Sequence, residues 1–116
     1  MAEKVLTGVK APYNEATTVA FEAATSAAYG FKYTLQGSDE YTLFVVQNTH
    51  ASAAKTITVK APTNGSYAAT DTDLVKSIAA GAFAVIRVES ARFANNDGTV
   101  KLIPESTDVK VVAVYR

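Results

Sequence analysis

His50 is the only histidine of the chain, and the hydroxyl groups of Thr49 and Ser52 lie close to it in sequence. A serine or threonine nucleophile needs such a histidine as its base, with a carboxylate that orients the imidazole. The chain has no Gly-x-Ser-x-Gly sequence, which presents the nucleophilic serine in many hydrolases. His50 lies in a small polar connector between two runs rich in β-branched and aromatic residues, so we predict a histidine at the tip of a turn.

Three clusters of acidic and amide side chains offer oxygen ligands for a hard cation such as Ca²⁺. None has the spacing of an EF-hand loop, and a lone histidine without any cysteine excludes the familiar zinc arrangements. Asp, Asn and Gly are also the residues that form turns. We therefore expect turns at these positions and no metal site. The clusters are Asp39 with Glu40, Asp71 with Asp73, and Asn95, Asn96 and Asp97.

Other catalytic and cofactor patterns are also missing from the sequence. It contains neither of the glycine-rich patterns that cradle the phosphates of nucleotides. Most acidic residues fall in expected loops or at strand ends, where solvated carboxylates are the rule and a glycosidase pair is not expected. The prediction is a chain that is not an enzyme and has no catalytic residue, cofactor or metal.

Length and charge restrict the class of protein. The 116 residues suit one domain, 1–116, with one hydrophobic core. Eleven basic residues balance eleven acidic ones and form no basic stripe, so nucleic acid is not an expected partner. No run of about eighteen apolar residues is present, so no membrane span and no membrane partner are expected.

From Phe31 onward apolar and polar residues alternate with a period of two, and turn residues such as Asn64-Gly65 interrupt the pattern at short intervals. This pattern is typical of β-strands, and no helix is expected there. The predicted fold is all-β, an antiparallel two-sheet β-sandwich of jelly-roll or immunoglobulin-like type with about eight strands.

The first thirty residues admit two structures. As a helix capped by Asn14, the segment would place a mostly alanine stripe on one face. As a strand at Thr17 to Glu22, it would alternate Val19 and Phe21 with Thr18 and Ala20. The alanine stripe buries little area and β-branched residues weaken a helix, which favours the strand. Residues 1–30 are alternatively a partly extended N-terminal arm.

Three predicted strands are apolar on both faces, whereas a solvated sandwich needs a polar outer face. Either the N-terminal segment or a long loop covers the outer face, or a protein partner or identical subunits do. We take six residues of these strands as the candidate interaction surface. They are Tyr41, Phe44, Phe83, Val85, Val112 and Val114.

The chain resembles small structural proteins of tailed bacteriophages and prophages that decorate or cement the capsid. The matching parts are the strand that ends in "QNT", the "AAG-aromatic" start of a strand, the turn "ARFANNDGTV" and the valine-rich last strand. They lie between Phe31 and Arg116, while Met1 to Gly30 is only loosely similar.

The resemblance implies a non-enzymatic virion structural protein that decorates or stabilises the capsid. Its expected partners are the major capsid protein or other virion proteins, and a homo-oligomer is allowed. Its expected location is the capsid surface, after synthesis in the cytoplasm of the bacterial host. The alternative is a carbohydrate- or protein-binding β-sandwich module of a phage tail or a bacterial surface protein, because such modules share the aliphatic-x-Asn-Thr and Ala-Gly features.

Overall fold

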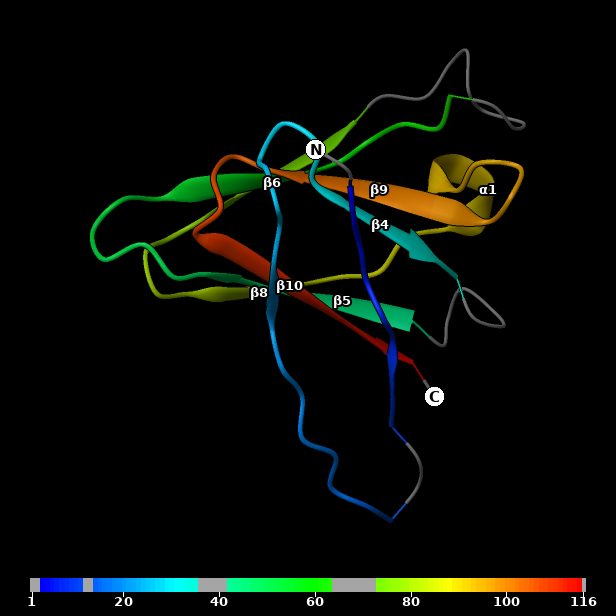
Figure 1. The fold of residues 1–116 in the computed structure, drawn as a ribbon, viewed down its shortest axis with the longest axis horizontal. Helices are drawn as coiled ribbons and strands as arrows, with labels where there is room; N and C mark the ends of the chain where they lie inside the picture. Colours follow the sequence, from blue (N-terminus) through cyan, green and yellow to red (C-terminus); the bar gives the residue numbers. More distant parts are fainter. Residues whose placement is uncertain (1–2, 12–13, 36–41, 64–72, 116) are drawn as a thin grey trace.

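The described part of the chain forms ten short strands in two facing sheets (Figure 1). The computed structural model describes residues 3–11, 14–35, 42–63 and 73–115. Sheet A has the order β1-β4-β9-β6-β7, formed by Lys4–Val5, Phe31–Thr34, Thr99–Pro104, Lys55–Val59 and Leu74–Ile78. Sheet B has the order β2-β10-β5-β8, formed by Val9–Lys10, Val109–Tyr115, Thr42–Asn48 and Phe83–Ile86, and β3 (Glu22–Ala23) also pairs with β10. The predicted all-β two-sheet sandwich is confirmed.

The sheets are mixed, which corrects the expectation of purely antiparallel pairing. Strand β1 runs parallel to β4, and β2 runs parallel to β10. The other pairs are antiparallel among the described strands. Parallel neighbours need a long connection between them. The chain provides it, because a long excursion separates β1 from β4 and most of the sequence separates β2 from β10.

The core lies between the inner faces of the two sheets. Alternate residues of each strand point inward, as the period of two predicts. Tyr33 of sheet A meets Phe44 of sheet B edge to face, with ring centroids 5.6 Å apart. Both aromatic rings are fully buried, so this contact ties the two sheets together. Other buried core residues are Phe31, Val46, Ile57, Val59, Val100, Leu102, Val109, Val111 and Ala113.

One short helix, α1 (Ser90–Phe93), connects β8 to β9. Phe93 and Ala94 pack against the core at this end of the sandwich. With four residues, α1 is far too short to cross a membrane, and no other helix occurs in the described ranges.

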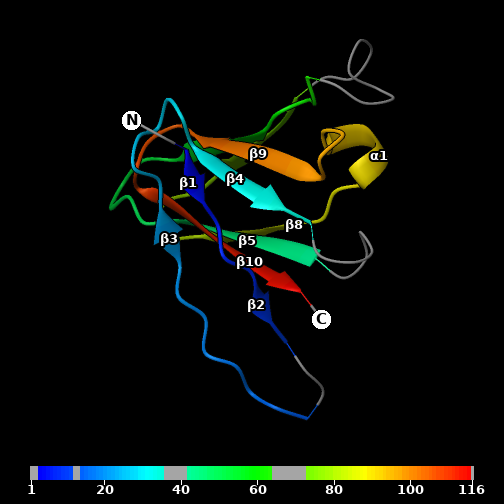
Figure 2. The same cartoon turned by 45° about the vertical axis from the view of Figure 1, so that its right-hand side comes forward.

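The N-terminal segment forms neither the helix nor the full strand considered from its sequence. Residues 14–21 have no regular secondary structure, and the strand expected from Thr17 to Glu22 is reduced to β3. Asn14, the possible helix cap, has a φ of 63° and lies in a turn. We call residues 14–20 the arm. Figures 1 and 2 show the blue segment that contains it projecting away from both sheets.

Both ends of this projection are fixed to the body. On the outgoing side, β1 and β2 pair with β4 and β10, and the Ala11 N–H donates to the Tyr115 carbonyl over 2.6 Å. On the returning side, β3 pairs with β10 and Glu22 forms an ion pair with Lys4 of 3.6 Å. The arm is therefore held at its base, while its own residues are exposed.

Candidate functional site

His50 lies in the connector between β5 and β6, as its sequence predicted. Its Nδ1 accepts hydrogen bonds from the N–H groups of Ser52, at 3.1 Å, and Ala53, at 2.9 Å. The imidazole thus closes the turn in the way a backbone carbonyl would. The Thr49 hydroxyl donates to the Asp108 carbonyl at 2.6 Å. Its donor is therefore directed to that carbonyl and not to His50.

The acidic clusters also serve as turn residues where the structure describes them. Asp97 Oδ1 accepts from the Thr99 N–H at 3.1 Å and the Thr99 hydroxyl at 2.6 Å, and these bonds hold the pKa of Asp97 below its ordinary value. Asp73 accepts from the Ala61 N–H at 2.7 Å and from the Lys60 ammonium at 2.8 Å. The Ala61 N–H is the main cause of the lowered pKa of Asp73, and Lys60 adds to it.

No group of three or more His, Cys, Asp or Glu side chains gathers as metal ligands within the described ranges. Asn95, a member of the third cluster, connects two loops, because its Oδ1 accepts a hydrogen bond from the Thr63 N–H at 2.9 Å. Asp39, Glu40 and Asp71 lie outside the described residues.

Asn48, at the end of β5, was not singled out from the sequence as a structural residue, although it belongs to the "QNT" feature. Its side chain is fully buried and donates to the carbonyls of Ala53, at 3.0 Å, and Ile78, at 2.9 Å. Its Oδ1 accepts from the His50 N–H at 3.0 Å. One amide therefore joins the β5–β6 connector to the end of β7. A polar residue at an inward position of an apolar strand was the available signal.

The predicted interaction surface maps mainly to the outer face of sheet B. Cross-strand register places Val112 opposite Val45 and Val45 opposite Val85, so the three valines form one row. Val85 and Phe83 on β8 are 62% and 58% exposed. Val114 on β10 is half-buried, and Tyr41 lies outside the described residues. The exposed part of the predicted surface is thus concentrated on the edge strand β8.

The inclusion of Phe44 in that surface is corrected by its position. Phe44 belongs to the inner face of β5, is fully buried and packs against Tyr33. Successive residues of a strand point to opposite faces, and Phe44 has the opposite parity to Val45. The two-faced pattern of this strand did not show which face was the inner one.

Val112 is apolar on the outer face and yet only 1% exposed, and the N-terminal segment explains this. In the β3–β10 pair, Ala23 lies opposite Lys110 and Glu22 opposite Val111. Continuing this register by one residue places Phe21 opposite Val112, on the same face. Part of the outer face is therefore covered from within the chain, which is one of the two alternatives drawn from the sequence.

The ring of Phe21 also reaches the ring of Phe83, with centroids 5.8 Å apart. Strands β3 and β8 lie on opposite sides of β10 and β5, so this contact spans the outer face of sheet B. Phe83 and Val85 remain largely exposed in spite of it. The internal cover therefore stops short of the free edge of the sheet.

A cavity of about 260 Å³ opens between β8 of sheet B and β7 of sheet A. Both are the last strands of their sheets. Leu74 and Val75 of β7 line it and are 41% and 59% exposed. Lys76 and Arg87 bring positive charge to the same opening. The sequence pattern did not indicate the contribution of β7, because Lys76 and Ser77 place a polar residue on each face of this strand.

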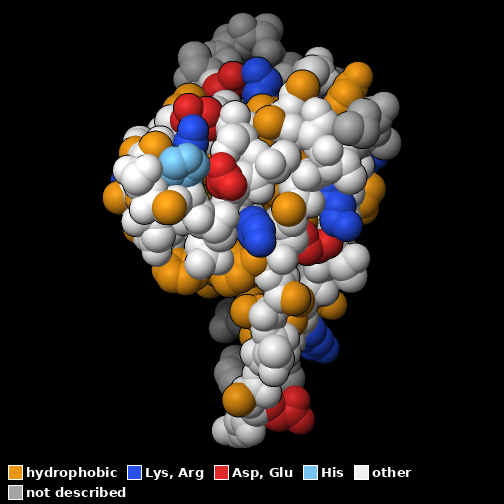
Figure 3. Space-filling model, turned by 60° about the vertical axis from the view of Figure 1, so that its left-hand side comes forward, with side chains coloured by type: hydrophobic (Ala, Val, Ile, Leu, Met, Phe, Trp, Pro, Cys, Tyr) orange, Lys and Arg blue, Asp and Glu red, His pale blue; other side chains and the backbone are white. Residues whose placement is uncertain are grey.

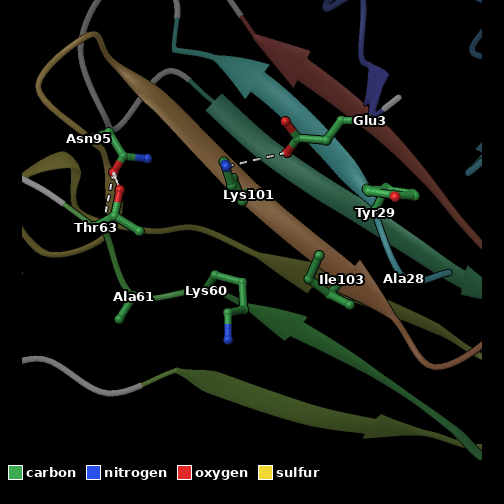
Figure 4. Close-up of a pocket in the computed structure, with 9 residues that line it drawn as sticks. All are labelled: Glu3, Ala28, Tyr29, Lys60, Ala61, Thr63, Asn95, Lys101 and Ile103. Atoms are coloured by element: carbon green, nitrogen blue, oxygen red, sulfur yellow. Dashed lines mark hydrogen bonds and ion pairs between the residues drawn. The ribbon is translucent and has the colours of Figure 1, made fainter. Parts of the chain in front are cut away.

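A second hollow, on the outer face of sheet A, has a volume of about 320 Å³ (Figure 4). Its polar groups are largely paired with neighbours, including Glu3 with Lys101 at 3.7 Å and Lys60 with Asp73 at 2.8 Å. Tyr29, 48% exposed, supplies an aromatic ring at its rim. The hollow therefore offers an exposed ring beside groups that already have partners.

A third hollow, of about 360 Å³, lies where β1 and β2 pass between the sheets, and Tyr33, Tyr115 and Gly8 line it. The hydroxyl groups of Tyr33 and Thr42 are buried, and neither has a hydrogen-bond partner among the residues that the structure describes. Burial raises the pKa of Tyr33, Tyr115 raises it further, and the nearby Thr42 hydroxyl opposes the shift. A Cβ at Gly8 would lie 2.5 Å from the Tyr33 hydroxyl oxygen, so the absence of a side chain there is a packing requirement.

Comparison of the chain with protein-family models, with curated proteins and with solved structures found no match.

Proposed function

We propose that the chain is a non-enzymatic structural protein of a phage virion that decorates or stabilises the capsid by binding the major capsid protein or another virion protein. The observation that carries the proposal is the exposed apolar surface of Phe83 and Val85 at the free edge of sheet B. Large apolar side chains gathered at a free sheet edge mark a protein-binding surface more often than a solvated one. The resemblance of the segment from Phe31 to Arg116 to capsid decoration proteins of phages suggests the class of partner.

The fold supports a role in adhesion on physical grounds. Exposed apolar side chains lose water when a partner covers them, which stabilises a complex by about 25 cal/mol for each Å² of apolar area buried, before the costs of association. A surface of this small size gives a weak single contact. Repetition over the identical sites of a symmetric lattice, together with any link between neighbouring copies, makes the total attachment durable.

The test is co-sedimentation with expanded empty capsids of the phage or prophage whose genome encodes the chain. We expect saturable binding by the wild type and an affinity lowered about tenfold or more by Phe83→Ser with Val85→Ser. Val5→Ser is the matched control, because Val5 is 60% exposed on β1, at the end of sheet A opposite to β7. Equal binding by the double variant, or no binding by the wild type, contradicts the proposal.

A carbohydrate-binding module is the second candidate, and the exposed ring of Tyr29 beside the polar hollow of sheet A favours it. Aromatic faces bind the apolar faces of sugar rings, with polar groups at the rim for orientation. A glycan array probed with the wild type and with Tyr29→Ala tests it. Glycan binding that is lost in Tyr29→Ala, without binding to capsids, supports this second candidate over the first.

A further inference from the structure

We propose that copies of this chain join by strand exchange, in which the arm of one copy adds to the free edge of β8 in another. The proposal names a partner for part of the surface assigned above to protein contacts, and it rests on that assignment. Three independent features carry it: the hydrogen-bonding groups of β8, the unused sequence of the arm, and the charges beside each.

β8 pairs with β5 on one side, and no other described strand pairs with its free edge. The Asn48 N–H donates to the Ala82 carbonyl at 3.1 Å, which makes this pair a hydrogen-bonded one in the β5–β8 ladder. Hydrogen-bonded and non-hydrogen-bonded pairs alternate along an antiparallel ladder. Counting from Ala82, the N–H and C=O groups of Phe83 and Val85 point away from β5, toward the free edge.

This edge lacks two of the devices that usually protect sheet edges, charged side chains and proline. Strand β8 reads Phe-Ala-Val-Ile, with no charged residue and no proline. The neighbouring edge strand of sheet A, β7, carries Lys76 in its centre. An apolar edge with outward hydrogen-bonding groups attracts any available strand. We infer that β8 is covered by such a strand in the assembled protein.

The arm supplies a strand of suitable sequence that the chain does not use for itself. Thr17, Thr18 and Val19 are β-branched and favour extended structure. Every residue of the arm is exposed, and none makes a hydrogen bond to another described residue. Figure 3 shows the arm region as a thin projection from the rounded body, so its sides are accessible to a second copy.

Charge complementarity sets the direction of the added strand. Glu15 is the only charged residue of the arm, and Arg87 directly follows β8 on its exposed side. Neither Lys76 nor Arg87 has an acidic partner among the residues that the structure describes. Antiparallel addition with Glu15 opposite Arg87 places Thr17 opposite Val85. Each copy then donates one arm and accepts one, and a reciprocal exchange between two copies closes the assembly as a symmetric dimer.

The test is the mass of the purified full chain by sedimentation equilibrium at rising concentration. The wild type is expected to form a closed oligomer. The donor variant carries Thr17→Pro and Thr18→Pro. It removes two successive N–H groups, one of which would face β8, in a segment that makes no hydrogen bond to the described residues of its own copy. The acceptor variant Val85→Pro removes an outward N–H, a position where edge strands tolerate proline. For each variant, we expect a dissociation constant of self-association at least about 100-fold higher than that of the wild type. Val85→Thr keeps the N–H and is the matched control that should still associate.

Mixing the two defective variants gives the decisive measurement, because each retains the part that the other has lost. The intact arm of Val85→Pro and the intact β8 edge of the double threonine variant should form a 1:1 heterodimer. A monomeric wild type at all concentrations, or a mixture that stays monomeric while the wild type associates, overturns strand exchange. Capsid binding by a monomeric wild type would overturn the exchange and leave the proposed function standing; self-association without capsid binding would do the reverse.

Discussion

At the scale of single residues, Asn48 is a buried polar group that joins the β5–β6 connector to the end of β7. Its buried amide satisfies the carbonyls of Ala53 and Ile78 and the N–H of His50. Asn48→Ala leaves these groups without their partner, and we expect the free energy of unfolding to fall by roughly 3 kcal/mol. Urea unfolding followed by circular dichroism measures this change. Gln47→Ala, on the outer face of the same strand, is the control and should cost under about 1 kcal/mol.

Two glycines with similar backbone angles are expected to differ in their tolerance of alanine. Gly30 has a φ of 63° and Gly81 a φ of 74°, so each substitution carries a conformational cost of about 1–2 kcal/mol. A Cβ at Gly30 would also collide with the carbonyl oxygen of Leu102, whereas no atom lies within 4 Å of a Cβ at Gly81. Gly30→Ala should therefore lower the thermal midpoint much more than Gly81→Ala. Equal midpoints would show that β9 moves aside.

At the scale of strands and turns, the outer face of sheet B has a covered position, Val112, and an open position, Phe83. A lysine at Val112, which is 1% exposed, buries an unpaired charge and should unfold the protein, at a cost of about 4 kcal/mol or more. A lysine at Phe83, 58% exposed, loses mainly the contact with Phe21 and should cost about 1 kcal/mol. Thermal unfolding of both variants checks the difference. A folded Val112→Lys would show that Phe21 does not seal this position.

The turns of Asp73 and Asp97 predict a loss of stability in acid. Both carboxyl groups have a pKa below the ordinary 3.8 in the folded protein, so their contribution is complete at neutral pH. It declines as the pH falls through about 3.8 and is gone below the folded-state pKa values. Asp97→Asn should therefore be less stable than the wild type at pH 7 and approach it in acid. A difference that persists unchanged at low pH would contradict this assignment.

The strands were predictable where one face is polar and the other is not. In β6, Thr56 and Thr58 alternate with Ile57 and Val59, and the two aliphatic residues are indeed buried. β5 is apolar on both faces, so its sequence could not show that Phe44 faces the core and Val45 the outside. The cover of Val112 by Phe21 depends on pairing between residues far apart in the chain, which no local pattern contains.

At the scale of the whole molecule, the proposed pairing of Glu15 with Arg87 predicts that reversing one charge weakens self-association and that reversing both restores it. Glu15→Arg and Arg87→Glu should each weaken self-association about fivefold, because each places like charges together. The double variant should recover most of the wild-type affinity, measured by sedimentation. If the double variant does not recover this affinity, the arm adds to β8 in another register.

The two anchored ends of the arm have a consequence for limited proteolysis. A protease specific for glutamate would cut after Glu15, in an exposed stretch flanked by strands that pair on either side. The shorter fragment would keep β1 and β2, and both are hydrogen-bonded to strands of the longer fragment. The nicked protein should therefore run as two bands under denaturing conditions and as one particle in native buffer, so that its projecting loop is opened without any piece being shed.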